Sequence, residues 1–212
     1  MADHDLLIEK LGRAITPVTR PWLPHWRVIA WIATALPCGI AASVWLNRAH
    51  TDWSQAGAVW SILQLLLTFS AGTLAVRNAF LLSIAGQRPL SWKWFAMLAS
   101  LWLVSTLLNL HLHHAPRIAG HEEETNCYLF MVVVSAPMVA LVIGYLRRTR
   151  TLFPARSLGA AGTGVACMAL TLLSLCHPTH ISLADLLMHI AATATIVAVT
   201  IVLGYKWVSL AD

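Results

Sequence analysis

Charged side chains are scarce in this sequence. Aspartate, glutamate, lysine and arginine make up 11% of its 212 residues, whereas apolar residues make up 58%. A soluble domain carries about a quarter charged residues, because that charge keeps its surface in water. So few charges cannot cover a globule of this size, and we expect lipid to cover it instead. No charged tail or low-complexity stretch is long enough to form a second domain.

Several motifs of other protein classes are also missing. We expect no secretory signal peptide before the first apolar run, because the first 26 residues hold Asp3, Asp5, Glu9, Lys10 and three prolines. The absence of a C-x-x-C pair argues against a thioredoxin-type redox enzyme. There is no nucleophile elbow, zinc-protease motif, phosphate loop or dinucleotide fingerprint. We therefore expect the protein not to be an enzyme.

Six apolar runs are each long enough to cross a bilayer, which takes about 20 residues. A backbone in lipid must satisfy its own hydrogen bonds, so each run must be helical. The runs span residues 28–47, 57–77, 94–112, 127–146, 158–176 and 183–205. The fifth contains Gly159, Gly162 and Gly164, whose spacing permits close helix–helix approach, and we expect it inside the bundle. The predicted fold is all-α, a polytopic membrane bundle of six transmembrane helices.

The positive charge is distributed unevenly along these runs. With the N-terminus inside, 11 of the 14 lysines and arginines fall in inner segments and only Arg48 and Arg117 in outer loops. Arg77 lies near the inner end of the second run, where its side chain can reach the interface. This asymmetry predicts that both termini are cytoplasmic, and it explains the net charge of +5 without direct nucleic-acid binding. The predicted organisation is a cytoplasmic N-terminal segment, the bundle and a short cytoplasmic tail, at residues 1–26, 27–206 and 207–212.

The N-terminal segment contains one apolar stripe outside the predicted membrane. From Asp5 to Ile15, apolar residues recur at the spacing of an amphipathic helix, and three prolines follow it. Such a stripe is suited to a groove on a partner protein. Its anchor residues are Leu7, Ile8, Leu11 and Ile15.

Two of the four cysteines lie at the outer boundary. Cys127 opens the fourth run and Cys176 closes the fifth, whereas Cys38 and Cys167 lie within runs, where cysteine behaves as a small hydrophobe. An oxidising compartment permits a disulfide between Cys127 and Cys176. Two unrelated interfacial cysteines are the alternative interpretation.

Histidine also gathers outside, with seven of ten residues at or beyond the outer boundary. Imidazole and thiolate together suit zinc or copper(I), and histidine protonation at about pH 6 is another input. Polar outer loops that tolerate histidine are the alternative. The candidate metal ligands are His113, His114, His121, His177 and His180.

Asp185 and His189 stand one turn apart at the outer end of the sixth run. Ionisable residues within apolar runs are functional candidates. A hydrogen-bonded structural pair and a functional site are both open for these two residues.

The chain resembles the NrsF-type anti-sigma factors, six-span inner-membrane proteins of bacteria that hold an extracytoplasmic-function sigma factor. The resemblance covers nearly the whole chain. The residues that carry it are D-L-L-I-E-K-L-G-R-A-I-T-P-V-T-R-P-W-L-P near the N-terminus, A-F-L-L-S-I-A-G-Q-R-P at Ala79 to Pro89, Cys127 followed by V-S-A-P at Val134 to Pro137, and Cys176 before Pro178. The chain departs from the family where His177 separates Cys176 from Pro178.

This resemblance implies a function in signal transduction across the bacterial inner membrane. The N-terminal segment would bind the sigma factor and block its use of RNA polymerase, and Cys127 and Cys176 would receive an oxidant or metal signal. The alternative is a small transporter or a metal- or haem-binding membrane protein that uses outer histidines, with His111 and His189 as a haem pair. A transporter usually needs several buried ionisable groups near the midplane, and the runs hold almost none.

Overall fold

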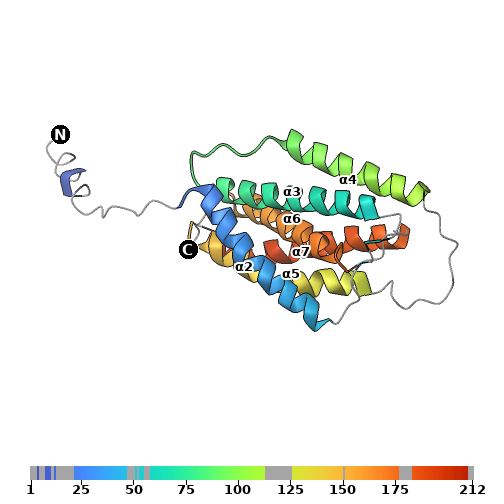
Figure 1. Cartoon of the computed structure of the whole chain (residues 1–212). Helices are drawn as coiled ribbons and strands as arrows, with labels where there is room; N and C mark the ends of the chain where they lie inside the picture. The colour runs from blue at the N-terminus through green and yellow to red at the C-terminus, as the bar shows by residue number, and fades with distance from the viewer. Residues whose placement is uncertain are drawn as a thin grey trace.

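Helices account for all the named elements of the structure, a computed structural model. It describes residues 22–46, 51, 53–54, 58–112, 126–149, 151–176 and 183–209, with His4, residues 8–10 and Gly12. The helices are α2 (Pro24–Trp45), α3 (Ala58–Leu82), α4 (Trp92–Leu112), α5 (Asn126–Arg147), α6 (Pro154–Leu173) and α7 (Leu183–Val208) (Figure 1). Within these ranges the β contacts amount to one isolated bridge, between Thr151 and Ser209. The predicted all-α fold is confirmed.

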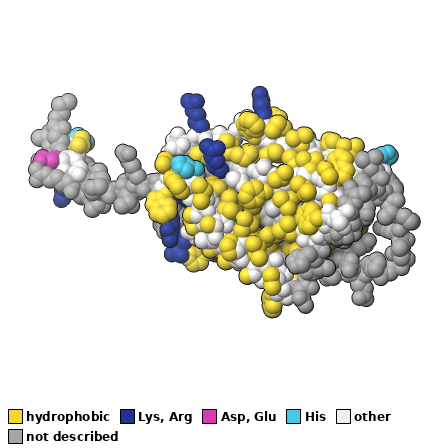
Figure 2. Space-filling model, in the orientation of Figure 1, with side chains coloured by type: hydrophobic (Ala, Val, Ile, Leu, Met, Phe, Trp, Pro, Cys, Tyr) yellow, Lys and Arg dark blue, Asp and Glu magenta, His cyan; other side chains and the backbone are white. Residues whose placement is uncertain are grey.

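The six helices are each long and apolar enough to cross a membrane. Large apolar side chains such as Ile40, Leu101 and Val202 are exposed on their outer faces. Figure 2 shows hydrophobic side chains over most of the described face of the bundle. An apolar surface of this extent is unsuited to water and suited to lipid. The structure thus supports the predicted multi-pass membrane protein.

Several helices extend beyond the apolar runs that predicted them. α2 begins at Pro24 and α6 at Pro154, because proline is favourable in the first turn of a helix, where its missing N–H is not needed. α3 continues to Leu82, past the predicted end at residue 77. The predicted runs stop short because polar residues interrupt the apolar pattern before each helix ends, at Arg27 in α2, at Arg77 and Asn78 in α3, and at Arg156 and Ser157 in α6.

α6 is the central helix, because it packs against α2, α3, α5 and α7. Twelve of its 20 residues are buried. A Cβ atom added to Gly162 would lie 2.9 Å from the Cα of Val197 in α7, and one added to Gly164 would lie 3.0 Å from the backbone N of Val76 in α3. The expected close packing of this helix through small residues is confirmed.

α4 lies at the edge of the bundle and makes its main packing contact with α3 (Figure 1). A hydrogen bond of 3.3 Å from Gln64 Nε2 to Thr106 Oγ1 joins these two helices within the apolar layer. The connection between them is held by Asn78, whose Oδ1 accepts from the backbone N–H of Leu90 at 2.9 Å.

The bundle has two chemically different ends. Helices that follow one another along the chain alternate in direction, so α2 begins and α7 ends on the same side (Figure 1). That side, called the basic end here, holds every lysine and arginine described in the bundle: Arg27, Arg77, Arg88, Lys93, Arg147, Arg148, Arg156 and Lys206. Figure 2 shows the dark blue side chains toward this end of the visible face. The opposite side, called the cysteine end, holds the start of α5 and the end of α6, and with them Cys127 and Cys176.

Candidate functional site

The cysteine end carries both thiols that the sequence predicted as sensors. Cys127 is the second residue of α5 and is only 4% exposed. Cys176 follows α6, where its backbone N–H donates to Leu173 O at 2.8 Å, and its side chain is half-buried. Because α5 and α6 pack against each other, a chemical change at these thiols acts on two adjacent helices. Their pairing remains a prediction.

Thr51, which lies between α2 and α3 in the chain, is hydrogen-bonded to the residues at the end of α6 beside Cys176. The backbone N–H of Thr51 donates to Leu175 O at 3.0 Å, and its hydroxyl donates to Ser174 O at 3.1 Å. The side chain of Thr51 is buried. Sequence reasoning did not identify this contact, because a single threonine in a polar loop carries no pattern.

Asp185 and His189 both lie in the first two turns of α7 and both are buried. One to two turns further along, Thr195 Oγ1 lies 3.1 Å from the hydroxyl of Tyr128 in α5. This hydrogen bond joins α7 to α5, the helix that contains Cys127. Both side chains are buried near the start of α7, at the cysteine end of the bundle, and their function remains a prediction.

His189 also lines a cavity of about 300 Å³ between α3, α4, α6 and α7. Cys167 and Trp102 line it as well, and its surface is almost entirely apolar. An ion pathway would need polar lining groups. The cavity therefore does not resemble a transport route.

The predicted metal ligands His113, His114, His121, His177 and His180 lie outside the described residues. Among the residues that the structure does describe, no three His, Cys, Asp or Glu side chains are grouped so that they could hold a metal ion. Zinc or copper binding at the cysteine end thus remains a prediction. His111, named for the haem alternative, is exposed near the end of α4.

The basic end contains a buried cation that sequence reasoning counted only as an inner charge. Arg27 lies in the first turn of α2 and is 5% exposed. Its Nη2 donates to Tyr145 O and to Thr149 Oγ1, both at 3.2 Å, and its Nη1 donates to Ser83 Oγ at a longer 3.4 Å. These acceptors lie at the end of α5 and just beyond the end of α3. One guanidinium therefore joins three helices.

Aromatic and hydroxyl groups complete this site, which we call the Arg27 clasp: Arg27, Phe80, Ser83, Tyr145 and Thr149. The guanidinium carbon lies 4.4 Å from the centre of the Phe80 ring, within the range of a cation–π interaction. The Ser83 hydroxyl donates its proton to Phe80 O at 2.8 Å. Its oxygen is therefore an acceptor for Arg27 and Thr149. The Thr149 hydroxyl lies 3.1 Å from Ser83 Oγ and has one proton to donate.

Arg27 differs from every other lysine or arginine described in the bundle, because all the others are exposed. Arg147, for example, is exposed and stacks over Trp207, with its guanidinium carbon 5.0 Å from the ring centre. The spacing of residues in α2 does indicate that Arg27 points into the bundle. Arg27, Trp31, Ala35 and Gly39 are four residues apart, so they share one helix face, and all of them are buried.

A second set of contacts fixes the turns around the clasp. The Thr151 backbone N–H donates to Val208 O at 2.9 Å, and its hydroxyl donates to Leu82 O at 3.1 Å. The Ser157 hydroxyl donates to Ala79 O at 3.0 Å. These hydrogen bonds hold together the ends of α3 and α7 and the start of α6.

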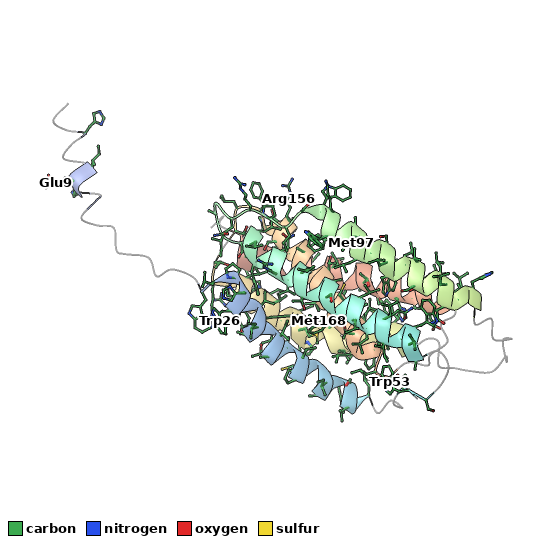
Figure 3. All side chains as sticks on the ribbon, turned by 45° about the horizontal axis from the view of Figure 1, so that its top comes forward. Glu9, Trp26, Trp53, Met97, Arg156 and Met168 are labelled. Carbon is green, nitrogen blue, oxygen red and sulfur yellow. The ribbon has the colours of Figure 1, made fainter. Side chains whose placement is uncertain are left out.

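The predicted partner-binding segment is described at His4, residues 8–10 and Gly12, which are helical and exposed. Ile8 is 67% exposed. Figure 3 shows Glu9 away from the bundle, and it shows Trp26 and Arg156 at the basic end and Trp53 at the opposite end. Leu7, Leu11 and Ile15 lie outside the described residues.

Comparison of the chain with protein-family models, with curated proteins and with solved structures finds no match in any of the three.

Proposed function

We propose that this protein is a non-enzymatic anti-sigma factor of the bacterial inner membrane. Its N-terminal segment binds an extracytoplasmic-function sigma factor in the cytoplasm, and an oxidant or a thiol-binding metal outside releases it. The observation that carries the proposal is Ile8, a 67% exposed apolar side chain on a helical segment outside the six spans. A helix with such an apolar stripe is suited to a hydrophobic groove on a partner.

The charge of the bundle supports the assignment of the basic end to the cytoplasm. Eight described lysines and arginines lie at that end, and lysine and arginine are enriched on the cytoplasmic side of membrane proteins. The N-terminal segment leads directly into α2 at this end. With the basic end in the cytoplasm, this segment would meet sigma factors, which are cytoplasmic.

The cysteine end supports an outer thiol input. Cys127 is buried at the first turn of α5, so a bond from its sulfur to another sulfur or to a metal must respect narrow geometric limits. Satisfying those limits displaces the start of α5 relative to its neighbours. Interiors are close-packed, so the displacement cannot be absorbed locally.

The transporter alternative has less support. The cavity next to His189 is almost entirely apolar, and the described parts of the spans hold Asp185, His189 and Arg27 as buried ionisable groups near the ends only. We therefore do not propose transport.

The proposal is tested by a sigma-dependent reporter in cells that make the full chain. Wild-type protein should repress the reporter and release it when hydrogen peroxide or zinc chloride is added. Cys127→Ser and Cys176→Ser should still repress, but their induction should fall by about fivefold or more, as expected when a coupling between two sites is lost.

Cys38→Ser is the matched control, because Cys38 is exposed toward lipid in the middle of α2 and should leave induction unchanged. Unchanged induction in both outer variants would remove the thiol input. Absence of repression by the wild-type chain would reject the anti-sigma function itself.

A further inference from the structure

We propose that Arg27 is a positioning residue that couples the movement of α5 to the sigma-binding segment. The inference rests on the proposed function, and it assigns the route by which a change at the cysteine end reaches the N-terminus. It is carried by the hydrogen bonds of Arg27 to the far end of α5 and by its place in the first turn of α2.

α5 connects the two ends of the bundle in a single helix. It begins at Asn126, beside Cys127, and ends at Arg147, and its 22 residues extend over about 33 Å at about 1.5 Å per residue. Tyr145 O and Thr149 Oγ1, the two acceptors for Arg27 Nη2, lie at its far end. The backbone N–H of Thr149 donates to Leu146 O at 3.0 Å, so Thr149 moves with the helix.

The N-terminal segment is equally closely joined to Arg27. The backbone N–H groups of Trp26 and Arg27 donate to Leu23 O at 3.0 and 3.3 Å. Pro24 fixes the backbone between them, because its φ angle is restricted by the ring. A displacement of Arg27 therefore displaces the point at which the N-terminal segment leaves the bundle.

Arg27 has partners from two helices, and Thr149 and Ser83 also bond to each other. Tyr145 O and Thr149 Oγ1 belong to α5 and its continuation, whereas Ser83 Oγ and the Phe80 ring belong to α3 and its continuation. A shift of α5 by about 0.5 Å would stretch its two 3.2 Å bonds beyond hydrogen-bonding range. The partners on α3 would remain. The structure shows the junction with α5 engaged, and such a shift would release α5 from Arg27.

If Arg27 were only a structural anchor, its burial would carry an unnecessary cost in desolvation free energy. Burying a cation without a carboxylate costs several kcal/mol, and a well-packed apolar side chain is often as stable. None of the described carboxylates pairs with Arg27, and its partners are hydroxyls, a carbonyl and an aromatic ring. The other described cations of the bundle stay exposed, which is the less costly arrangement.

The test measures the affinity of the full chain, in lipid nanodiscs, for its sigma factor before and after hydrogen peroxide treatment. Peroxide takes two electrons and two protons from the outer thiol pair, forms the disulfide and is reduced to two water molecules. The ratio of the two dissociation constants is the coupling. We expect a wild-type ratio of about fivefold or more.

Thr149→Val removes the hydroxyl at nearly constant volume. Arg27→Lys keeps the charge but replaces the two nitrogens that separately contact α3 and α5 by the single nitrogen of an ammonium. Their ratios should fall to about one, because in both variants the reduced chain already has weakened bonds between residue 27 and α5. Thr149→Ser, which keeps the hydroxyl, should restore the wild-type ratio. Arg88→Lys is the matched control, because Arg88 is exposed at the same end.

A purely structural role for Arg27 would lower the thermal midpoint of the variants and leave the ratio unchanged, and that result would overturn the inference. A wild-type ratio of one would also overturn it while leaving the anti-sigma function intact. Failure of the reduced wild-type chain to bind any extracytoplasmic-function sigma factor would instead reject the proposed function. Two variants of different chemistry protect the result against misfolding of either one.

Discussion

At the scale of single residues, the four cysteines occupy four different environments. Cys38 is exposed in the middle of α2, where lipid surrounds it, and Cys167 lines the apolar cavity. Cys127 is buried at the start of α5, and Cys176 is half-buried after α6. Only the last two lie at an end of the bundle, where water-borne reagents have access. Reactivity toward such reagents should therefore differ among the four.

We predict that a membrane-impermeant maleimide applied to the outer side of intact cells modifies Cys176 first. Cys127 should react at least about tenfold more slowly, because it is buried and must first be exposed by a local opening. An opening that costs about 1.4 kcal/mol already reduces the rate tenfold. Cys38 should require a lipid-soluble maleimide. Mass spectrometry of the labelled chain measures all of these at once, with Cys176→Ser as the control. Labelling of Cys176 only from the cytoplasmic side would contradict the orientation.

At the scale of helices, α6 holds the bundle together. Its contacts with α3 and α7 bring backbone against backbone, which is how membrane helices gain stability when no hydrophobic effect drives them together. Gly164 is the clearest case, because an added Cβ atom would lie 3.0 Å from the backbone N of Val76 and 3.1 Å from the backbone O of Gly72. Neither backbone atom can move away by a side-chain rotation.

We predict that Gly164→Ala destabilises the protein by about 1 to 3 kcal/mol, since α3 and α6 must separate to admit the methyl group. Gly144→Ala is the matched control. An added Cβ atom at Gly144 meets nothing within 4 Å, and alanine is about 0.5 to 1 kcal/mol more favourable than glycine inside a helix. Thermal unfolding in detergent should thus show opposite signs for the two substitutions. Equal midpoints would contradict the close packing of α6.

The helices and the central place of α6 could be predicted from the sequence, because long apolar runs and closely spaced glycines are local patterns. The direction of Arg27 was not predicted. A charged side chain at the end of a span normally points toward the interface. Arg27 points inward because Ser83, Tyr145 and Thr149, which are distant in sequence, provide its hydrogen-bond acceptors there. The same holds for Thr51, whose acceptors Ser174 and Leu175 are 123 and 124 positions away along the chain.

At the scale of the whole molecule, the proposed signal input and the proposed sigma-factor binding lie at opposite ends of the bundle. The cysteine end holds Cys127 and Cys176, and the basic end holds the Arg27 clasp and the start of the N-terminal segment. α5 reaches from one end to the other and packs against α2, α6 and α7 on the way. This geometry suits a protein that receives a signal on one side of a membrane and answers on the other.

The central claim is that the N-terminal segment binds a sigma factor, and its most direct test is retention of that sigma factor by the purified full chain. The candidate partners are extracytoplasmic-function sigma factors of the same genome, beginning with any encoded beside this gene. We predict that the wild-type chain retains one of them. Ile8→Asp should weaken binding about tenfold or more, because a carboxylate would enter an apolar groove. Glu9→Gln, next to it on a different side of the helix, should bind like the wild type. Equal affinity of the wild type and Ile8→Asp, or no retention of any such sigma factor, would contradict the account.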